Sequence, residues 1–442
     1  MRLFSLMTLS PLAALLALGC DSPSGNSTPA PDTTDDATGQ EVTPDAPDAP
    51  DAPDVPPAPE CQSTADCADK VGRPICNLAT NTCEALPGGY LIGTGDGTVG
   101  SVNLVELYRP AQPIESTDLA FHPERDELWV VNRRFEVQGV CAQSNPGSAR
   151  CRSLGSTTTI LFGAGTPGQR ASTLEDLNSW HFMRRAPALA MGALDTFATC
   201  GEAATANFED DPVTYMGPTL WSSDPEIYAV RDPSFDNGSH LDMLHTTPLC
   251  VGIAHERDNL YWFFNGDAGS IDRVNFNEPH EPGGDDHSDG EVHRFAKGLL
   301  TRLPNVPSHM VFNPADSHLY IVDSGTARVL KLDTTSGTPG GRLSPVYELL
   351  RSSGEFDNAT LSVVVDQGQL IEPSGLALHE GVLYVSDHKT SKIHAFDLAG
   401  APLRTLETGL PEGTLAGIEV GPDNRLYFTD MLGGAVYRID WQ

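Results

Sequence analysis

The chain has 442 residues and carries 27 Lys or Arg against 60 Asp or Glu, which gives a formal net charge of −33. A protein this acidic repels nucleic acid and anionic membrane surfaces, so we exclude DNA and RNA as partners. The length is enough for more than one folded unit, and the composition changes along the chain.

Residues 1–20 have the pattern of an export signal. Arg2 supplies the positive start, and residues 3–18 form an apolar stretch that is too short for a comfortable membrane span. The stretch ends in Leu-Ala-Leu-Gly-Cys, which resembles the lipobox of bacterial lipoproteins, although Ala17 stands where that motif usually has Leu. The resemblance implies lipidation of Cys20, and the alternative is an ordinary secretory signal. We expect an exported protein anchored by lipid at the outer membrane, the cell surface or in the periplasm.

Residues 21–60 read as an acidic, disordered tether. They contain ten Asp or Glu and no Lys or Arg, with Pro and Asp recurring along residues 44–54. Such a segment cannot bury a core, and its like charges extend it. The sequence therefore predicts a spacer between the membrane anchor and a globular part.

Residues 61–87 are expected to form a small disulfide-rich module. Four cysteines occur in 23 residues: Cys61, Cys67, Cys76 and Cys83. Their spacing lacks the close pairs of zinc ribbons, and an even number of cysteines suits an oxidising compartment. The module resembles short EGF-like or cysteine-rich knots with two disulfides, whose pairing stays open.

Residues 88–442 repeat a pair of short strands. The second strand recurs as Leu-Trp-Val-Val-Asn at 128–132, Leu-Tyr-Trp-Phe at 260–263, Leu-Tyr-Ile-Val-Asp at 319–323, Leu-Tyr-Val-Ser-Asp at 383–387 and Leu-Tyr-Phe-Thr-Asp at 426–430. We interpret each as a half-buried strand that ends in a turn residue. A degenerate sixth copy would place a first strand at residues 181–183 and a second at 195–200.

The six copies start at residues 118, 181, 252, 309, 375 and 417. This spacing predicts an all-β fold, a six-bladed β-propeller. The last copy has only three strands, so we expect residues 89–107 to complete its blade and close the ring. The repeated phrases resemble the NHL family of β-propellers, whose blades carry a Leu-Tyr-Val-x-Asp pattern.

Four further cysteines fall within the propeller. Cys141 and Cys151 bracket an insertion rich in Ser, Asn, Pro, Gly and Ala. We expect these two to form a disulfide. Cys200 and Cys250 lie in the second copy and just before the third. A disulfide between them would tie neighbouring blades together.

A metal site is predicted in the central channel, which the first strand of each blade lines. The six copies begin with Asp118, His181 and His309 and with three glycines, which could leave a hollow between the polar residues. His240 and His245 are expected on a blade-joining loop at the same face. Histidine and carboxylate together suit zinc or a related divalent ion. The alternative is that each histidine bonds backbone groups or solvent.

The arrangement also resembles the peptidyl-amidating lyase branch of NHL-type propellers. Thr-Asp-Leu-Ala at 117–120 and Ser-His-Met-Val at 308–311 stand where that family has Thr-Asp-Val-Ala and Pro-His-x-x. The resemblance implies a catalytic zinc held by channel histidines, although Ser308 replaces the proline. Gluconolactonase-like propellers hold calcium through Glu and Asn, and the set here does not match theirs.

A second possible metal site is the acidic loop at residues 277–291, which joins two outer strands. Its candidate calcium ligands are Asp285, Asp286, Asp289 and Glu291. Oxygen ligands suit calcium, but the spacing is not that of an EF-hand. We expect this loop near the rim on the face opposite His240 and His245, and the alternative is a solvated acidic loop.

Two functions remain open at this point. The first is a recognition scaffold, expected to be monomeric, that binds a protein, peptide or glycan on a propeller face. The second is a metal-dependent lyase or hydrolase with its site in the channel. The sequence contains no phosphate loop, no nucleophile elbow and no dinucleotide fingerprint. Propellers serve both binding and catalysis, so the fold does not decide between the two.

Overall fold

A computed structural model describes residues 59–441, apart from residues 63, 68–69, 71–74, 78–79, 86, 113, 135–154, 207–214, 231–236 and 345. The chain divides into two units, Met1–Ala58 and Pro59–Gln442, and every described residue belongs to the second. The predicted signal, most of the tether, Cys20 and the predicted Cys141–Cys151 disulfide lie outside the described residues. No helix in the described part of the chain is long and apolar enough to cross a membrane.

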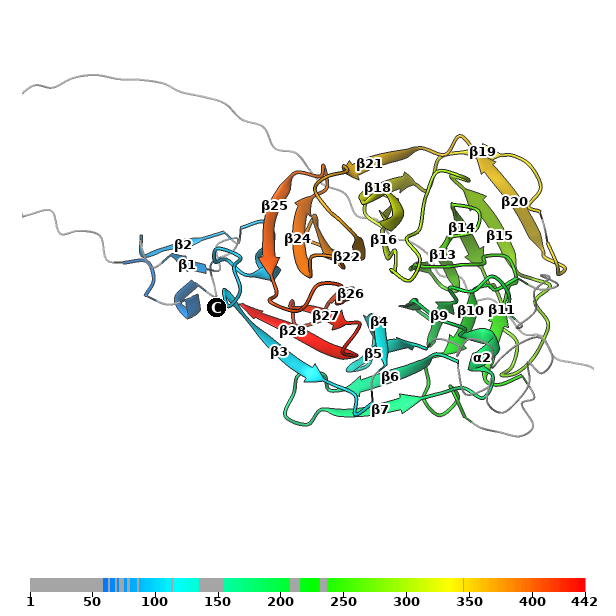
Figure 1. Cartoon of the computed structure of the whole chain (residues 1–442), viewed down its shortest axis with the longest axis horizontal. Coiled ribbons are helices and arrows are strands. Elements are labelled where there is room, and N and C mark those ends of the chain that lie inside the picture. Colours follow the sequence, from blue (N-terminus) through cyan, green and yellow to red (C-terminus); the bar gives the residue numbers. More distant parts are fainter. Residues whose placement is uncertain are drawn as a thin grey trace, which may run out of the picture. The chain divides into compact units, whose positions relative to one another are not determined.

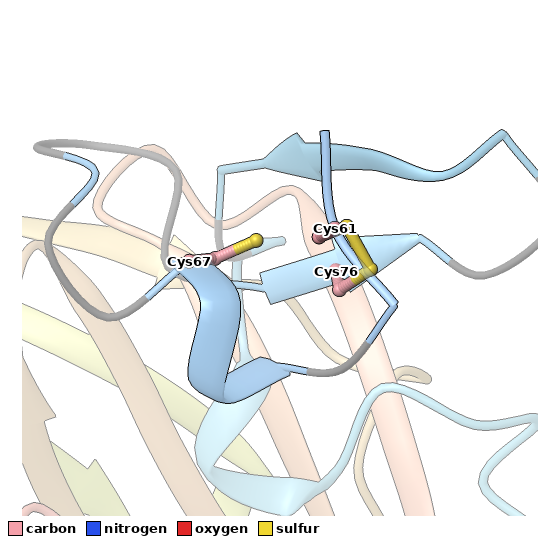
Figure 2. A group of neighbouring side chains, drawn as sticks. All are labelled: Cys61, Cys67 and Cys76. Carbon is pink, nitrogen blue, oxygen red and sulfur yellow. A yellow bond between two sulfur atoms is a disulfide. The ribbon is translucent and has the colours of Figure 1, made fainter. Parts of the chain in front are cut away.

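The small module holds two disulfides, which join Cys61 to Cys76 and Cys67 to Cys83. Figure 2 shows the bond between Cys61 and Cys76 beside the single-turn helix that carries Cys67. Two short strands, β1 (Ile75–Asn77) and β2 (Thr82–Glu84), pair so that Cys76 lies opposite Cys83. The single-turn helix is η1 (Thr64–Cys67). A segment of this size has little apolar surface to bury, so the disulfides supply the stability that a core would give.

The remaining strands form six sheets arranged around a common centre, antiparallel except for one parallel pair, which confirms the predicted six-bladed β-propeller (Figure 1). Blade 1 contains β4 (Glu115–Phe121), β5 (Glu127–Arg133), β6 (Thr157–Phe162) and β7 (Arg170–Leu174). Blade 2 contains β8 (Ala188–Met191), β9 (Thr196–Cys200), β10 (Thr219–Ser222) and β11 (His240–Met243). Blade 3 contains β12 (Ile253–Arg257), β13 (Leu260–Asn265), β14 (Ser270–Asn275) and β15 (Glu291–Phe295).

The second half of the ring continues the same order, with the first strand of each blade innermost. Blade 4 contains β16 (Met310–Asn313), β17 (His318–Asp323), β18 (Arg328–Asp333) and β21 (Leu361–Val365). Blade 5 contains β22 (Pro373–His379), β23 (Val382–Asp387), β24 (Lys392–Asp397) and β25 (Pro402–Glu407). Blade 6 contains β26 (Leu415–Val420), β27 (Leu426–Asp430) and β28 (Ala435–Trp441) and takes its outer strand, β3 (Val102–Tyr108), from the start of the domain.

The closure of the ring is as the sequence predicts. Strand β3 pairs antiparallel with β28, with Val105 opposite Arg438. The single-turn helix η2 (Tyr90–Ile92) precedes β3, and its three residues are buried in the core of the last two blades. Pairing the first and last segments of the domain gives blade 6 its fourth strand and covers the outer edge of β28.

Blade 3 is extended by a segment that belongs in sequence to blade 4. Strands β19 (Thr338–Pro339) and β20 (Ser352–Asp357) lie between β18 and β21, and β20 pairs in parallel with β15. His293 of β15 lies opposite Gly354 of β20. This insertion ties the outer edge of blade 3 to blade 4, and no repeat in the sequence marks it.

The recurring acid at the end of the second strand organises the turn that follows. Asp323 accepts hydrogen bonds from Thr301 N, from the Thr326 hydroxyl and from the Arg328 guanidinium. Asp387 likewise accepts from Ile371 N and Thr390 N. Each carboxylate therefore joins its own turn to the segment that enters the blade. The strands themselves are buried on both faces, because neighbouring blades cover them, rather than half-buried as predicted.

The predicted first strand of the degenerate copy is wrong. Residues 181–183 do not form a strand, because His181 and Phe182 lie in the short helix α2 (Ser179–Phe182). The inner strand of blade 2 is β8, whose Ala-Leu-Ala-Met sequence has small, apolar residues that fit the crowded centre of the ring. The predicted second strand is correct and corresponds to β9.

The hydrophobic core lies between neighbouring sheets rather than within one layer. Trp129 of blade 1 and Trp221 of blade 2 belong to one buried cluster. Val322 of blade 4 and Leu383 of blade 5 belong to another. Because each sheet buries both faces against its neighbours, the ring fixes the inner strands and the side chains that they turn toward the channel.

Candidate functional site

A cavity of about 220 Å³ lies on the axis of the propeller, and inner strands of all six blades line it. Most of the residues that line it are apolar, with Phe121 and Phe312 among them, but polar and apolar atoms contribute about equally to its surface. Four ionisable residues line the cavity: Asp118, His255, His309 and Glu419. The ring of His255 bonds the carbonyl oxygen of Asp258 in its own hairpin. A cavity lined mainly by apolar residues with a few converging polar groups is the usual form of a ligand site.

Asp118 is held by the backbones of two blades. It lies in β4 and is only 7% exposed. Its Oδ1 accepts a hydrogen bond from Leu119 N at 2.9 Å, and its Oδ2 accepts one from Leu189 N of blade 2 at 3.0 Å. Burial raises the pKa of Asp118 to about 8, even though both hydrogen bonds favour the charged form. At neutral pH the carboxyl is therefore protonated.

His309 stands directly beside this carboxyl. It precedes β16 and is buried, with its Nε2 at 3.3 Å from the carbonyl oxygen of Pro187. An Nε2 proton donated to that carbonyl leaves Nδ1 as an acceptor. Nδ1 lies 3.4 Å from Asp118 Oδ1 and has no hydrogen-bond partner. Burial lowers the pKa of His309 to about 4, so a neutral imidazole faces a protonated carboxyl.

Glu419 is a further polar residue of the cavity that the sequence did not predict. It lies in β26 of blade 6 and lines the same cavity. Burial first, and then the charge of Asp118, raise the pKa of Glu419 to about 8. The available signal was an acidic residue at 419, inside an inner strand whose counterparts in other blades are apolar.

The three glycines at the start of inner strands do not leave a hollow. A Cβ on Gly417 would lie 2.7 Å from the Cα of Asp118, and a Cβ on Gly252 or Gly375 would overlap a carbonyl oxygen of the next blade. Glycine is required at these positions because neighbouring inner strands approach too closely for any side chain. Gly417 thereby sets the position of Asp118 in the channel.

The five predicted metal ligands do not form one site. Asp118 and His309 meet in the channel, whereas His181, His240 and His245 lie near the outer edge of blade 2. His240 is the first residue of strand β11, not part of a blade-joining loop. The rings of His181 and His245 are 5.8 Å apart between centroids.

The channel residues also lack the close grouping of a metal centre. The described residues contain two groups in which three potential ligand atoms lie within 4.8 Å of one another. One group is Cys61, Cys67 and Cys76, whose sulfurs form disulfides. The other is His240, His280 and His287, which lie outside the channel.

The predicted calcium ligands do not form such a group either. Asp286 accepts hydrogen bonds from the backbone and hydroxyl of Ser288, and Asp289 accepts one from Glu278 N. Asp285 is exposed, and Glu291 is the first residue of β15. Two of these carboxylates thus order turns of the loop, and the acidic loop contributes His280 and His287 to the histidine group instead.

The end of the propeller at which the inner strands begin is crossed by Arg133. This last residue of β5 bonds Glu115 and Glu202, the carbonyl oxygen of Asn305 and the sulfur of Met431. Its side chain is 1% exposed. One guanidinium thus connects blade 1 to segments of blades 2 and 6 and to the segment that enters blade 4.

The pKa of Asp118 gives the stability of the protein a pH dependence with a defined sign. The folded-state pKa of about 8 lies above ~3.9, the usual value in unfolded chains, so the folded form binds an extra proton between these pH values. The free energy of unfolding therefore falls as the pH rises through this range, by up to about 1.4 kcal/mol per pH unit. We expect Asp118→Asn to reduce that slope between about pH 6.5 and 8, as measured by urea unfolding.

The exposed acid Glu412, whose side chain is 75% exposed, provides the control for this pH dependence. Glu412→Gln should keep the slope of the unmodified protein. Equal slopes in the Asp118→Asn variant and the unmodified protein would show that Asp118 is ionised when folded.

Comparisons with known proteins found similar solved structures at low sequence identity. No protein-family model and no curated protein matches the chain. Among solved structures, an auxiliary nutrient binding protein from Bacteroides ovatus is 10% identical with a TM-score of 0.45, over 76% of this chain and 76% of the other. Virginiamycin B lyase from Staphylococcus aureus is 10% identical with a TM-score of 0.42, over 77% of this chain and 99% of the other. A gluconolactonase from Xanthomonas campestris is 14% identical with a TM-score of 0.43, over 80% and 93%.

Proposed function

We propose that the protein is an exported recognition module that binds its ligand at the channel of the propeller. The observation that carries this proposal is the cavity of about 220 Å³ in which Asp118, His309 and Glu419 meet among apolar residues. Ionisable groups with strongly shifted pKa values in a cavity are a mark of functional sites. The burial of these groups has a cost in stability, which a role in binding would explain.

The volume of the cavity and the residues that line it indicate which ligand it can hold. Sites for whole small molecules usually measure ~300–1,000 Å³, so this cavity suits a very small molecule or one side group of a larger ligand on the propeller face. The apolar residues that line the cavity would pack against an apolar group of the ligand. The protonated carboxyls of Asp118 and Glu419 would donate hydrogen bonds to an acceptor such as a carbonyl oxygen. A peptide or protein that inserts one apolar side chain fits best.

The proposal includes export and lipid anchoring through Cys20. The apolar stretch of residues 3–18, the lipobox-like ending and the acidic residues 21–60 support it. The three disulfides of the described chain agree with an oxidising compartment. We also propose an NHL-type repeat, because the repeated Leu-Tyr-Val-x-Asp phrases coincide with second strands of the blades.

Catalysis is the second candidate function, and the contact between Asp118 and His309 favours it. A protonated carboxyl beside a neutral imidazole can supply a general acid and a general base to one substrate. Such a pair suits a lyase or hydrolase that needs no metal. The metal-dependent alternative would use the same two residues with Glu419, and it needs them to move closer together.

Binding is tested with N-acetyl amides of leucine, valine and phenylalanine, which combine an apolar side group with carbonyl acceptors. Titration calorimetry on the full chain should give saturable binding with one site. Asp118→Ala and Glu419→Ala should each weaken it about 10-fold, as expected for the loss of one hydrogen bond. Glu412→Gln should bind like the unmodified protein.

The same variants separate the two candidate functions. No saturable binding of any of the three probes, or equal affinity in the channel variants, would reject the channel as the recognition site. His309→Ala should leave affinity within a few-fold if the protein only binds. Turnover of a bound amide or ester that is lost in His309→Ala would make the acid–base function the leading one.

A further inference from the structure

Three histidines from two blades converge at the outer edge of blade 2. His240 begins β11, and the loop between β14 and β15 carries His280 and His287. The loop is fixed on β11 by backbone hydrogen bonds from His280 N to Leu241 O and from Gly283 N to His240 O. One ligand atom from each histidine lies within 4.8 Å of the other two. The ring centroids of His240 and His280 are 5.0 Å apart.

Each of the three rings has its Nδ1 close to an oxygen. Nδ1 of His240 is 2.9 Å from the carbonyl of Asn237, Nδ1 of His280 is 2.7 Å from the carbonyl of Glu281, and Nδ1 of His287 is 3.4 Å from the carboxylate of Glu348. The Nε2 atoms of His280 and His287 are buried and have no hydrogen-bond partner. A proton held on Nδ1 by an oxygen leaves Nε2 with a free lone pair, which is how metal-binding histidines are oriented.

A buried carboxylate of β11 lies close to the histidine group. The register of β11 shifts between the two residues, so that His240 lies opposite Trp221 and Asp242 lies opposite Leu220. Asp242 is 0% exposed, and neither of its carboxylate oxygens has a hydrogen-bond partner. A buried carboxylate without a partner is costly unless a cation or proton neutralises it. The carboxylate of Asp242 interacts electrostatically with the ring of His287. Asp242 therefore lies next to the histidine group.

The insertion from blade 4 completes the surroundings. Glu348 lies between β19 and β20, and besides its contact with His287 it accepts a hydrogen bond from His245 N at 2.6 Å.

We propose that His240, His280 and His287 bind a zinc-class divalent metal ion through their Nε2 atoms, with Asp242 as the neighbouring carboxylate. Three imidazoles and a carboxylate are a donor set that zinc favours, whereas calcium needs mainly oxygen ligands. A tetrahedral zinc ion with bonds of ~2.0–2.1 Å separates its ligand nitrogens by roughly 3.4 Å. The ligand atoms lie within 4.8 Å of one another, so they need to approach by up to about 1.4 Å, which side-chain rotation supplies.

The role of this ion is to fasten blades together. It would fix the long loop of blade 3 to the edge strand of blade 2, and Glu348 would add the insertion from blade 4. This site is separate from the channel cavity, since none of its residues lines that cavity. Loss of the metal should therefore loosen the outer edge of the propeller without removing the channel residues.

The test uses the full chain, purified without a polyhistidine tag, stripped with a chelator and titrated with zinc chloride. We expect one equivalent of tightly bound zinc and a rise in melting temperature of about 3–4 °C when free zinc is 100-fold above the dissociation constant. Cobalt(II) should give the visible absorption bands of a tetrahedral site. His280→Ala with His287→Ala should abolish all three signals. Both side chains are only partly buried, so the variant should fold.

Two further variants make the assignment specific. Glu348→Gln should weaken zinc binding about 10–100-fold, the usual effect of removing a carboxylate that orients a metal-binding histidine. His318→Ala, a histidine of similar burial on blade 4 whose ring contacts Asp316, should bind zinc like the unmodified chain. The proposal is overturned if the unmodified chain shows neither bound zinc nor a shift in melting temperature. It is also overturned if the double variant retains them.

Discussion

Replacing Arg133 with alanine is expected to lower the free energy of unfolding by about 3–5 kcal/mol, the usual cost of breaking a buried ion pair. The guanidinium lies 2.9 Å from Glu115 and 3.2 Å from Glu202, and the side chains of Arg133 and Glu202 are 1% and 2% exposed. Removing it leaves the buried carboxylate of Glu202 with Arg302 as its remaining cation. It also breaks links that join several blades across one end of the channel. Urea unfolding at constant pH measures the effect.

Two control variants distinguish the contribution of a buried ion pair from that of a surface ion pair and from that of the planar guanidinium group. Arg109→Ala removes a guanidinium that also pairs with a carboxylate at 2.8 Å, but the two side chains are 43% and 42% exposed. It should cost about 1 kcal/mol or less. Arg133→Lys keeps the positive charge but loses the planar guanidinium group. Its loss in free energy of unfolding should lie between those of Arg109→Ala and Arg133→Ala. An Arg133→Ala protein as stable as Arg109→Ala would show that Arg133 does not hold the ring together.

Removing the disulfide between Cys200 and Cys250 is expected to have a similarly large effect. The bond closes a loop of 50 residues and joins the end of β9 to the segment that enters blade 3. Both cysteines are buried. For a loop of this length, the chain-entropy model gives about 4 kcal/mol of stability. We expect the double variant Cys200→Ala, Cys250→Ala to lose about this amount in urea unfolding.

The disulfides of the small module provide the comparison. Replacing Cys61 and Cys76 with alanine removes a loop of only 15 residues. The chain-entropy model gives about 3 kcal/mol for that loop. The variant should destabilise only the small module. The midpoint of the main unfolding transition, which belongs to the propeller, should stay unchanged. An unchanged midpoint in the Cys200→Ala, Cys250→Ala variant would mean that the inner strands alone fix blades 2 and 3.

The sequence identified the channel residues only in part. Asp118 and His309 were recognisable because each is a polar residue at the same place in a repeated apolar strand. Glu419 occupies a comparable inner strand, but an alignment of the strand starts did not single it out. His181 was assigned to the channel because the degenerate second copy offers no Leu-Tyr-Val-x-Asp phrase to fix its register. The true inner strand, β8, begins seven residues later.

The histidine group was not predictable as a unit. His240 and the loop of residues 277–291 were expected on opposite faces, whereas the structure brings His240 into contact with His280 and His287. The path of that loop depends on its hydrogen bonds to the edge of β11. Glu348 reaches the group through an insertion that pairs in parallel with β15. Neither event leaves a pattern in the local sequence.

The sequence by itself determined the all-β class, the six repeats and the closure of the ring by the first strand. These features follow from local strand patterns and turn residues that recur along the chain. The tertiary structure decided which polar side chains meet. Packing of blade against blade brings Asp118, His309 and Glu419 into one cavity, and packing of a loop on an edge strand assembles His240, His280 and His287. Contacts between residues distant in the chain depend on the path of the whole backbone, which local periodicity does not encode.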